Sequence, residues 1–395
     1  MTLMTLETQA LRDASAATSR PMRSWSPSSL VRRPEFGAFV ATVFVYAFFA
    51  ATAYRYGFVT FDGTAGWLNT AAELGIIAIP VGILMVAGEF DLSVGAVVGA
   101  ASITVAIGTT LFGFSVWLMI SATLALGLAV GVLNGLLVVR TGLPSFIVTL
   151  ASSFSIGGLS LGLARLLSNT TSVSVKSTPL SDAVFASNWG QANISILWWF
   201  AITIFGGWVL ARTAFGNWIF ATGGNPVAAR GAGVPTGFVK IVLFMMTGLG
   251  ASLVGVIQAV GYHSGNATAG LGYVFQAPIV AVIGGVLLGG GYGSAFGVFL
   301  GTVIFGVINI GIFYTGWSTD WVQLFLGVLL MAAVITNHYF RRLAMSAGQP
   351  TARGSAWLLK TAPSSNCKAS PSALPASRRL LTCLLAFQPG RWSAF

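Results

Sequence analysis

Long apolar stretches separated by short polar connections run through most of this chain. Several of them reach the roughly 20 residues that an α-helix needs to cross the hydrocarbon core of a bilayer. The pattern predicts ten membrane spans, at about 37–56, 67–87, 92–111, 115–138, 145–166, 194–211, 238–260, 274–289, 294–314 and 321–340. The eighth of these spans is the shortest and carries a proline near its start.

The composition agrees with a chain that lies mostly in lipid. Hydrophobic residues make up 55% of the sequence and charged residues 7%, whereas a soluble domain carries about 25% charged residues. The expected fold is therefore an all-α, polytopic membrane bundle of about ten transmembrane helices. We expect a polar cytoplasmic leader (1–35), a transmembrane domain (36–342) and a disordered tail (343–395), because Ser, Pro, Ala and Arg dominate the last segment.

The net charge of +11 does not indicate nucleic-acid binding, because the basic residues gather beside the spans. Arg32 and Arg33 precede the first span, and Arg341 and Arg342 follow the last one. An excess of Lys and Arg beside spans is typical of cytoplasmic flanks. With the N-terminus inside, Arg140 also falls in an inner connection. The charges therefore favour ten spans with both termini in the cytoplasm.

Motifs for catalysis and for cofactor binding are missing from the sequence. We find no nucleotide-binding loop, no HExxH metal motif and no dinucleotide fingerprint. His263 and His338 fall in a loop and at the end of a span, and Cys367 and Cys383 both fall in the tail. The sequence therefore indicates neither an enzyme nor a metal-binding or cofactor-binding protein.

Acidic residues are scarce within the predicted spans. A proton-driven or sodium-driven carrier usually needs buried carboxylates along its path, whereas Glu73 is the one acidic residue placed well inside a span. If the chain moves a solute, we therefore expect the energy to come from another protein. A self-sufficient ion-coupled carrier stays open as an alternative, with Glu73 as its anchor.

The longest inner connection, at about 211–237, can form a short helix of its own. Asn225 is a suitable N-cap, Pro226 suits the first helical position, and Gly233 can end the helix. The alanines between them keep one face small. Such a helix can dock into a groove of another protein, or it can be an ordinary amphipathic loop helix. The pattern alone favours neither.

The stretch GEFDLSVGAVVGA lies between the second and third spans and carries two of the nine acidic residues. Asp91 and Ser93 precede a helix, where a side-chain oxygen can accept from free backbone N–H groups. A structural cap or gate hinge is therefore the favoured role for Asp91, with contact to a substrate or to an ATPase as alternatives. A pairing of Glu89 with Arg140 is open. The signature and gate candidates are Glu89, Asp91, Ser93 and Gly95.

These motifs, in this order, resemble those of the permease subunits of bacterial ATP-binding-cassette (ABC) importers for simple sugars, the ribose, xylose and galactose group. GEFDLSVGAVVGA resembles the family's Gly-Gly-Ile-Asp-Leu-Ser-Val-Gly-Ser signature, and LPSFIVTLASSFSIGGLSL resembles its Pro-Pro-Phe-Ile-Val-Thr-Leu-Gly segment. FATGGNPVAARGAGV resembles the loop that contacts the ATPase in the family. AVIGGVLLGGGYGSAFGVFLGTVIFGVINIGI and WVQLFLGVLL complete a resemblance over about residues 40–340.

The resemblance implies a multi-pass protein of the bacterial inner membrane that works with partners. These are a cytoplasmic ABC ATPase subunit, a second permease subunit (an identical copy or a sibling) and a periplasmic sugar-binding protein, but no nucleic acid. ATP and Mg²⁺ belong to the ATPase, and this chain is expected to bind no cofactor. The implied ATPase-coupling residues are Gly224, Asn225, Ala228, Ala229, Arg230 and Gly233.

A sugar carries many hydroxyl groups, so its path needs neutral hydrogen-bonding side chains and aromatic faces. Such side chains within spans can equally well bridge helices or anchor the membrane interface. The pathway candidates are Asn134, Thr149, Ser152, Gln258 and Asn309, with Phe154 and Trp321 as stacking surfaces.

Import of a monosaccharide is the favoured function. A permease of the same superfamily for branched-chain amino acids, nucleosides or a sugar-like signalling molecule is the first alternative. The ion-coupled carrier is the second.

Overall fold

The structure is a computed structural model that describes residues 34–347, with side chains from 36 to 335. Most of the expected leader and tail, including both cysteines, lies outside these residues. The packing described below concerns the unit that ends at Phe340. Its longer helices are α3 (Pro34–Thr52), α4 (Phe61–Val86), α5 (Val94–Thr110), α6 (Val116–Thr141), α7 (Ser145–Ser168), α9 (Ser195–Arg212), α12 (Thr236–Gly261), α14 (Ala295–Thr315) and α15 (Trp321–Ala347).

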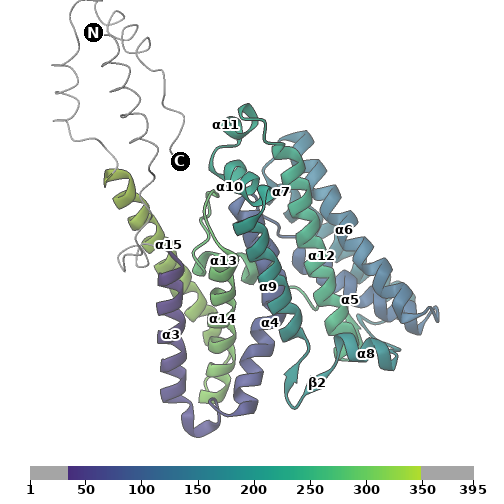
Figure 1. The fold of residues 1–395 in the computed structure, drawn as a ribbon. Coiled ribbons are helices and arrows are strands. Elements are labelled where there is room, and N and C mark those ends of the chain that lie inside the picture. Colours follow the sequence, from purple (N-terminus) through teal and green to yellow (C-terminus); the bar gives the residue numbers. More distant parts are fainter. Residues whose placement is uncertain (1–33, 348–395) are drawn as a thin grey trace, which may run out of the picture. The chain divides into compact units, whose positions relative to one another are not determined.

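Shorter elements join the long helices. The short helices are η1 (Tyr54–Tyr56), α8 (Pro179–Phe185), α10 (Ala214–Gly224), α11 (Pro226–Gly231) and α13 (Tyr273–Ile283). Four short strands form two antiparallel pairs: β1 (Ser172–Ser174) with β4 (Ser264–Asn266), and β2 (Asn188–Trp189) with β3 (Ala192–Asn193). Helices α10 and α11 lie at one end of the long helices, and α8 and β2 lie at the other (Figure 1).

Six of the described helices are long and apolar enough to cross a membrane: α4, α6, α7, α9, α12 and α14. Four shorter apolar segments, Phe36–Thr52, Val94–Thr110, Tyr273–Ile283 and Trp321–Ile335, coincide with the four remaining predicted spans. A polytopic helical membrane fold is therefore confirmed. The number of crossings and the side of each terminus stay predictions.

The expected spans and the observed helices differ where glycine or polar residues set the boundary. The eighth span was expected to reach residue 289, but α13 ends at Ile283 because Gly285 follows with a φ of +93°, a region that favours glycine. Helix α15 continues to Ala347, past the expected domain end at residue 342. The sequence pattern did not reveal α8, α10 or the strand pairs, because each is too short to show an apolar period.

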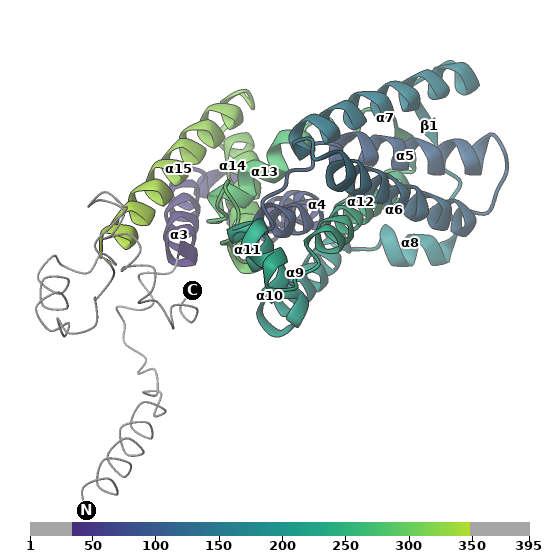
Figure 2. The ribbon, with the colours of Figure 1, turned by 90° about the horizontal axis from the view of Figure 1, so that it is seen from above.

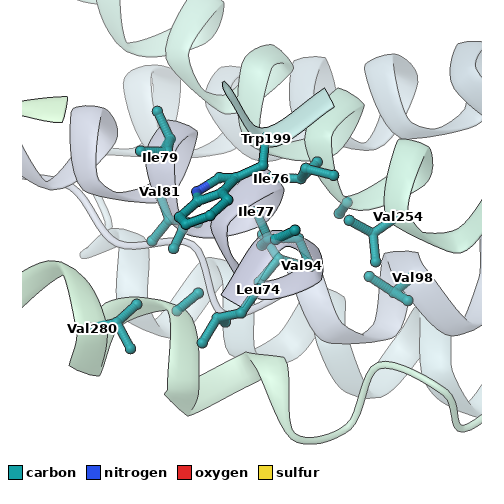
Figure 3. Packing of buried hydrophobic residues seen from close by; sticks show 14 of the residues in the cluster. Leu74, Ile76, Ile77, Ile79, Val81, Val94, Val98, Trp199, Val254 and Val280 are labelled. Carbon is teal, nitrogen blue, oxygen red and sulfur yellow. The ribbon is translucent and has the colours of Figure 1, made fainter. Parts of the chain in front are cut away.

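Helix α4 lies at the centre of the bundle and is almost completely buried along its second half. It contacts α9, α12, α13 and α14, and Figure 2 shows it between α12 on one side and α13 and α14 on the other. The fully buried Trp199 of α9 reaches α4, where it lies among Ile76, Ile79 and Val81 (Figure 3). A Cβ atom on Gly75 would lie 2.1 Å from the Trp199 ring nitrogen, so glycine makes room for the indole.

Helices α6 and α12 cross at glycines. A Cβ atom on Gly131 of α6 would lie 2.3 Å from the Phe244 carbonyl oxygen, and one on Gly248 of α12 would lie 2.1 Å from the Gly127 carbonyl oxygen. Lipid provides no hydrophobic drive between helices, so close backbone packing through small residues holds them together. By contrast, half of the residues of α7 are exposed.

Candidate functional site

The segment between α4 and α5, residues 87–93, interrupts what would otherwise be a continuous apolar helix. Gly88 has a φ of +85°. Its N–H donates to the Met85 carbonyl oxygen at 2.9 Å, and the Glu89 N–H donates to the Leu84 carbonyl oxygen at 3.2 Å. This pair of hydrogen bonds is the Schellman pattern that ends helices. Helix α4 therefore stops here, and the following residues are free to take other partners.

Asp91 is the centre of a buried polar network and is only 1% exposed. One carboxylate oxygen, Oδ1, accepts from the Ser93 N–H at 2.9 Å and from the Ser93 hydroxyl at 2.6 Å. The other accepts from the Thr247 hydroxyl of α12. Asn134 Nδ2 of α6 donates to the Ser93 hydroxyl at 2.9 Å. The network therefore joins the start of α5 to α6 and α12.

This geometry separates the roles of the two residues expected to cap α5. Ser93 makes no capping hydrogen bond to the helix, because its hydroxyl is engaged by Asp91 and Asn134. Asp91 takes the acceptor role instead, for the Ser93 N–H. Gly95 lies in the first turn of α5, where a Cβ atom would come within 2.4 Å of the Gly270 carbonyl oxygen.

Two hydroxyl groups of α7 fix the backbone of the same segment. The Phe90 N–H donates to Ser145 Oγ at 3.0 Å, and the Leu92 N–H donates to Thr149 Oγ1 at 3.1 Å. The Thr149 hydroxyl itself donates to the Ser145 carbonyl oxygen at 2.8 Å. Thr149, a predicted pathway residue, is thus buried and holds the 87–93 segment in place.

Glu89 forms an ion pair with Lys240, which lies near the start of α12. The sequence left open a pairing with Arg140, and Lys240 takes that place because α12 packs against the 87–93 segment, where its Thr247 also binds Asp91. Both side chains are largely shielded from solvent. The pair therefore fixes the 87–93 segment to α12 at the end that carries α10 and α11.

Helix α11 forms as its local sequence predicts. Asn225 Oδ1 accepts from the Val227 N–H at 3.1 Å and from the Ala228 N–H at 3.0 Å, and proline occupies the first helical turn. The helix ends at Gly231, and Gly233 follows with a φ of +84°. The predicted N-cap and the predicted helix are confirmed.

The surface of α11 is exposed and mixed in character. Val227 is 71% exposed and Arg230 is also exposed, whereas Ala229 is buried. The Arg230 Nε donates to the Pro226 carbonyl oxygen at 3.2 Å, which holds the guanidinium along the helix. The remaining implied coupling residues, Gly224, Asn225, Ala228 and Gly233, are exposed as well.

Glycines from three segments meet between α10 and the 87–93 segment. A Cβ atom on Gly223 of α10 would lie 1.8 Å from the Val86 carbonyl oxygen, and one on Gly290 would lie 2.8 Å from the Gly88 Cα. The Gly291 N–H donates to the Val86 carbonyl oxygen at 2.8 Å. We call this contact the glycine junction. It joins the end of α4, the end of α10 and the connection between α13 and α14, backbone against backbone.

The predicted pathway residues do not form one site. Asn134 and Thr149 belong to the buried network around the 87–93 segment. Gln258 and Asn309 lie at the opposite end of the helices, where both are associated with Glu73. The others lie on α7 and at the start of α15, away from both groups: Ser152 is half-buried, Phe154 is 75% exposed and Trp321 is exposed.

Several residues of these networks were not found from the sequence. Ser145, Lys240 and Thr247 bind the 87–93 segment, and Tyr262 and Tyr273 donate to Glu73. A polar residue within an apolar stretch was the available signal for Thr247 and Ser145. That signal does not identify a partner, because partners come from distant parts of the chain.

Comparison with known proteins gives a consistent result. The family model described as "Branched-chain amino acid transport system / permease component" matches residues 63–334. No solved structure matched the chain.

Three curated relatives, all from Escherichia coli (strain K12), cover most of both chains. The inner membrane ABC transporter permease protein YjfF is 32% identical over 73% of this chain and 87% of its own. The ribose import permease protein RbsC is 28% identical over 71% of this chain and 87% of its own. The L-arabinose transport system permease protein AraH is 31% identical over 75% of this chain and 89% of its own.

Proposed function

Because the chain belongs to the family of branched-chain amino acid transport system permease components, and within it to the ribose-type ABC permeases of the inner membrane, we propose that it forms the membrane path of an ATP-driven monosaccharide importer. The substrate is a sugar of the ribose, xylose or galactose type. Two relatives named for ribose and L-arabinose support that choice.

The exposed helix α11 is the proposed site at which the energy of ATP hydrolysis reaches this chain. It presents Val227 and Arg230 to solvent beside the glycine junction, and a short exposed helix is suited to a groove of another protein. In the proposal a cytoplasmic ABC ATPase binds this surface and binds ATP and Mg²⁺. This chain then needs no cofactor and catalyses no reaction of its own.

The remaining partners follow from the same class of transporter. A second permease subunit completes the path, and a periplasmic sugar-binding protein delivers the substrate at the end opposite α11. This places α11 and both termini in the cytoplasm and gives the chain ten crossings. The basic residues beside the predicted spans support this orientation.

Uptake by cells that express the complete transporter tests the proposal. Val227→Asp places a charge on the exposed apolar side chain of α11 and is expected to abolish uptake of labelled sugar while the protein stays in the membrane. Leu180→Asp is the matched control, because Leu180 is also an apolar and largely exposed side chain but lies on α8 at the other end. Normal uptake by the Val227 variant contradicts the coupling role of α11.

The identity of the substrate and the source of energy need separate measurements. A panel of ribose, xylose, galactose, a nucleoside and a branched-chain amino acid is offered to the same cells. Uptake of a sugar that stops on ATP depletion, and continues when ion gradients are collapsed, supports the proposal. Uptake that follows the ion gradient instead supports the carrier built on Glu73.

A further inference from the structure

A polar cavity lies at the end of the helices opposite α11. Its volume is about 350 Å³, within the roughly 300–1,000 Å³ range of small-molecule sites. It is lined by side chains from α4, α13, α14 and the β3 strand, and Tyr262 lies on it just after α12. No residue of the 87–93 segment or of α11 takes part in it.

Glu73 forms one wall of the cavity and is held by three neutral donors. Gln258 Nε2 donates to its carboxylate at 2.8 Å, and the hydroxyls of Tyr262 and Tyr273 donate at 3.1 Å each. The negative charge beside it raises the pKa of the Tyr262 phenol, so the phenol remains a donor. Among the described residues, no Lys or Arg forms an ion pair with Glu73. The wall therefore presents a fixed but uncompensated negative charge.

Carboxamide groups line the rest of the cavity. Asn193, Gln276 and Asn309 are half-buried there. Each carboxamide offers both hydrogen-bond donors and an acceptor, and within the described part of the chain none of the three side chains makes a hydrogen bond to the protein. The buried Phe305 adds an apolar surface. These groups are available to a solute that enters the cavity.

This arrangement defines the chemistry of the solute. Hydroxyl groups both donate and accept, as the free carboxamides do, and a carboxylate is a strong acceptor for them. An anionic solute meets the charge of Glu73 at short range, where like charges repel. We propose that the cavity is a binding site for an uncharged polyhydroxy solute of monosaccharide size, and that Glu73 excludes sugar acids. The inference rests on the proposed function for its place in transport.

Direct binding to the purified full-length permease in lipid nanodiscs tests this site without its partners. The probes are D-galactose and D-galacturonate, which share a ring and differ in charge. The wild-type protein is expected to bind D-galactose at least about tenfold more tightly than D-galacturonate. No detectable binding of D-galactose, or equal binding of the two probes, overturns the proposal.

Variants then connect the binding to the cavity. Gln276→Ala combined with Asn309→Ala is expected to weaken D-galactose binding about tenfold or more, whereas Gln323→Ala, an exposed glutamine on α15, leaves it unchanged. Glu73→Gln is expected to reduce the preference for D-galactose over D-galacturonate. A general loss of folding cannot produce that change of ratio, and thermal unfolding of each variant checks the fold.

The test of the cavity and the test of the proposed function can fail independently of each other. If the complete transporter imports a sugar while the Gln276 and Asn309 variant binds and imports it like the wild type, the cavity is not the site and the importer still stands. If no sugar is imported but the purified permease binds D-galactose through this cavity, the site stands and the importer fails.

Discussion

Asp91 illustrates how a single buried carboxylate can organise several helices. It accepts two hydrogen bonds from Ser93 and one from Thr247, and Asn134 joins through Ser93. Each of these donors is buried and has little access to water. Leaving a buried donor without an acceptor costs more free energy than the net gain from forming one hydrogen bond on folding. The carboxylate therefore joins the start of α5 to α6 and α12 through buried hydrogen bonds.

Replacing this acceptor is expected to destabilise the fold. Asp91→Ala leaves the Ser93 N–H and hydroxyl without their acceptor, while the Thr247 hydroxyl keeps the Phe244 carbonyl oxygen; we expect this to lower the free energy of unfolding by about 1–3 kcal/mol. The measurement is the thermal unfolding temperature in detergent. Asp62→Ala, at an exposed residue in the first turn of α4, serves as control. Equal unfolding temperatures for the two variants contradict the role assigned to Asp91.

The Glu89–Lys240 ion pair makes a second prediction for single residues. Lys240→Ala removes the cation from the largely shielded carboxylate of Glu89, which is expected to destabilise the protein more than loss of an exposed charge. The double variant Glu89→Gln with Lys240→Ala is expected to recover part of the loss, with a coupling of about 0.5–3 kcal/mol. Unfolding measurements on the four proteins give this coupling, and strictly additive effects exclude it.

At the scale of elements, the crossing of α6 and α12 depends on the absence of side chains. Gly131 and Gly248 bring the two backbones together, and a Cβ atom at either one meets a carbonyl group of the facing helix. Helices of this length and apolarity fit the membrane in any rotation about their own long axes. The glycines therefore select which faces pack.

Two helical glycines provide a matched pair for this prediction. Gly131→Ala is expected to lower the yield of folded protein, because the added methyl group lies 2.3 Å from the Phe244 carbonyl oxygen. Gly158→Ala on α7 adds a methyl group with no atom within 4 Å, and alanine favours a helix by about 1 kcal/mol over glycine. The second variant should thus fold as well as the wild type or better. Similar yields of folded protein from both variants contradict the packing argument.

The same scale shows what the sequence could and could not predict. The positions of the apolar helices follow from length and hydropathy alone, and α11 follows from local capping by Asn225. The early end of α13 depends on the positive φ of Gly285. A glycine in a sequence does not by itself reveal this conformation, because many glycines adopt a negative φ. The partner of Glu89 depends on how α12 packs, so Arg140 and Lys240 could not be told apart beforehand.

The candidate site was predictable to a similar degree. Asp91, Asn134 and Thr149 stood out as polar residues in apolar surroundings, and the structure brings these three together. Nothing in the sequence indicates that Gln258 and Asn309 lie instead beside Glu73, because that proximity arises only when α4, α12 and α14 pack.

At the scale of the whole molecule, the family model ends at residue 334 and leaves the last part of the chain unmatched. The networks around the 87–93 segment, α11 and the Glu73 cavity all lie before that point. A permease shortened after Ala347 is therefore expected to insert into the membrane like the full chain. Cells that express the transporter with this shortened permease are expected to take up sugar like cells with the full chain. Loss of uptake with normal insertion assigns residues 348–395 a role in transport.

The glycine junction has a mechanical consequence. In most protein contacts a layer of side chains separates two backbones, and changes of rotamer absorb small displacements. No such layer exists where Gly223, Gly290 and Gly88 meet, so changes of rotamer cannot absorb a shift of α10 there. A displacement of the surface helix beside it therefore passes to the end of α4 through direct backbone contact.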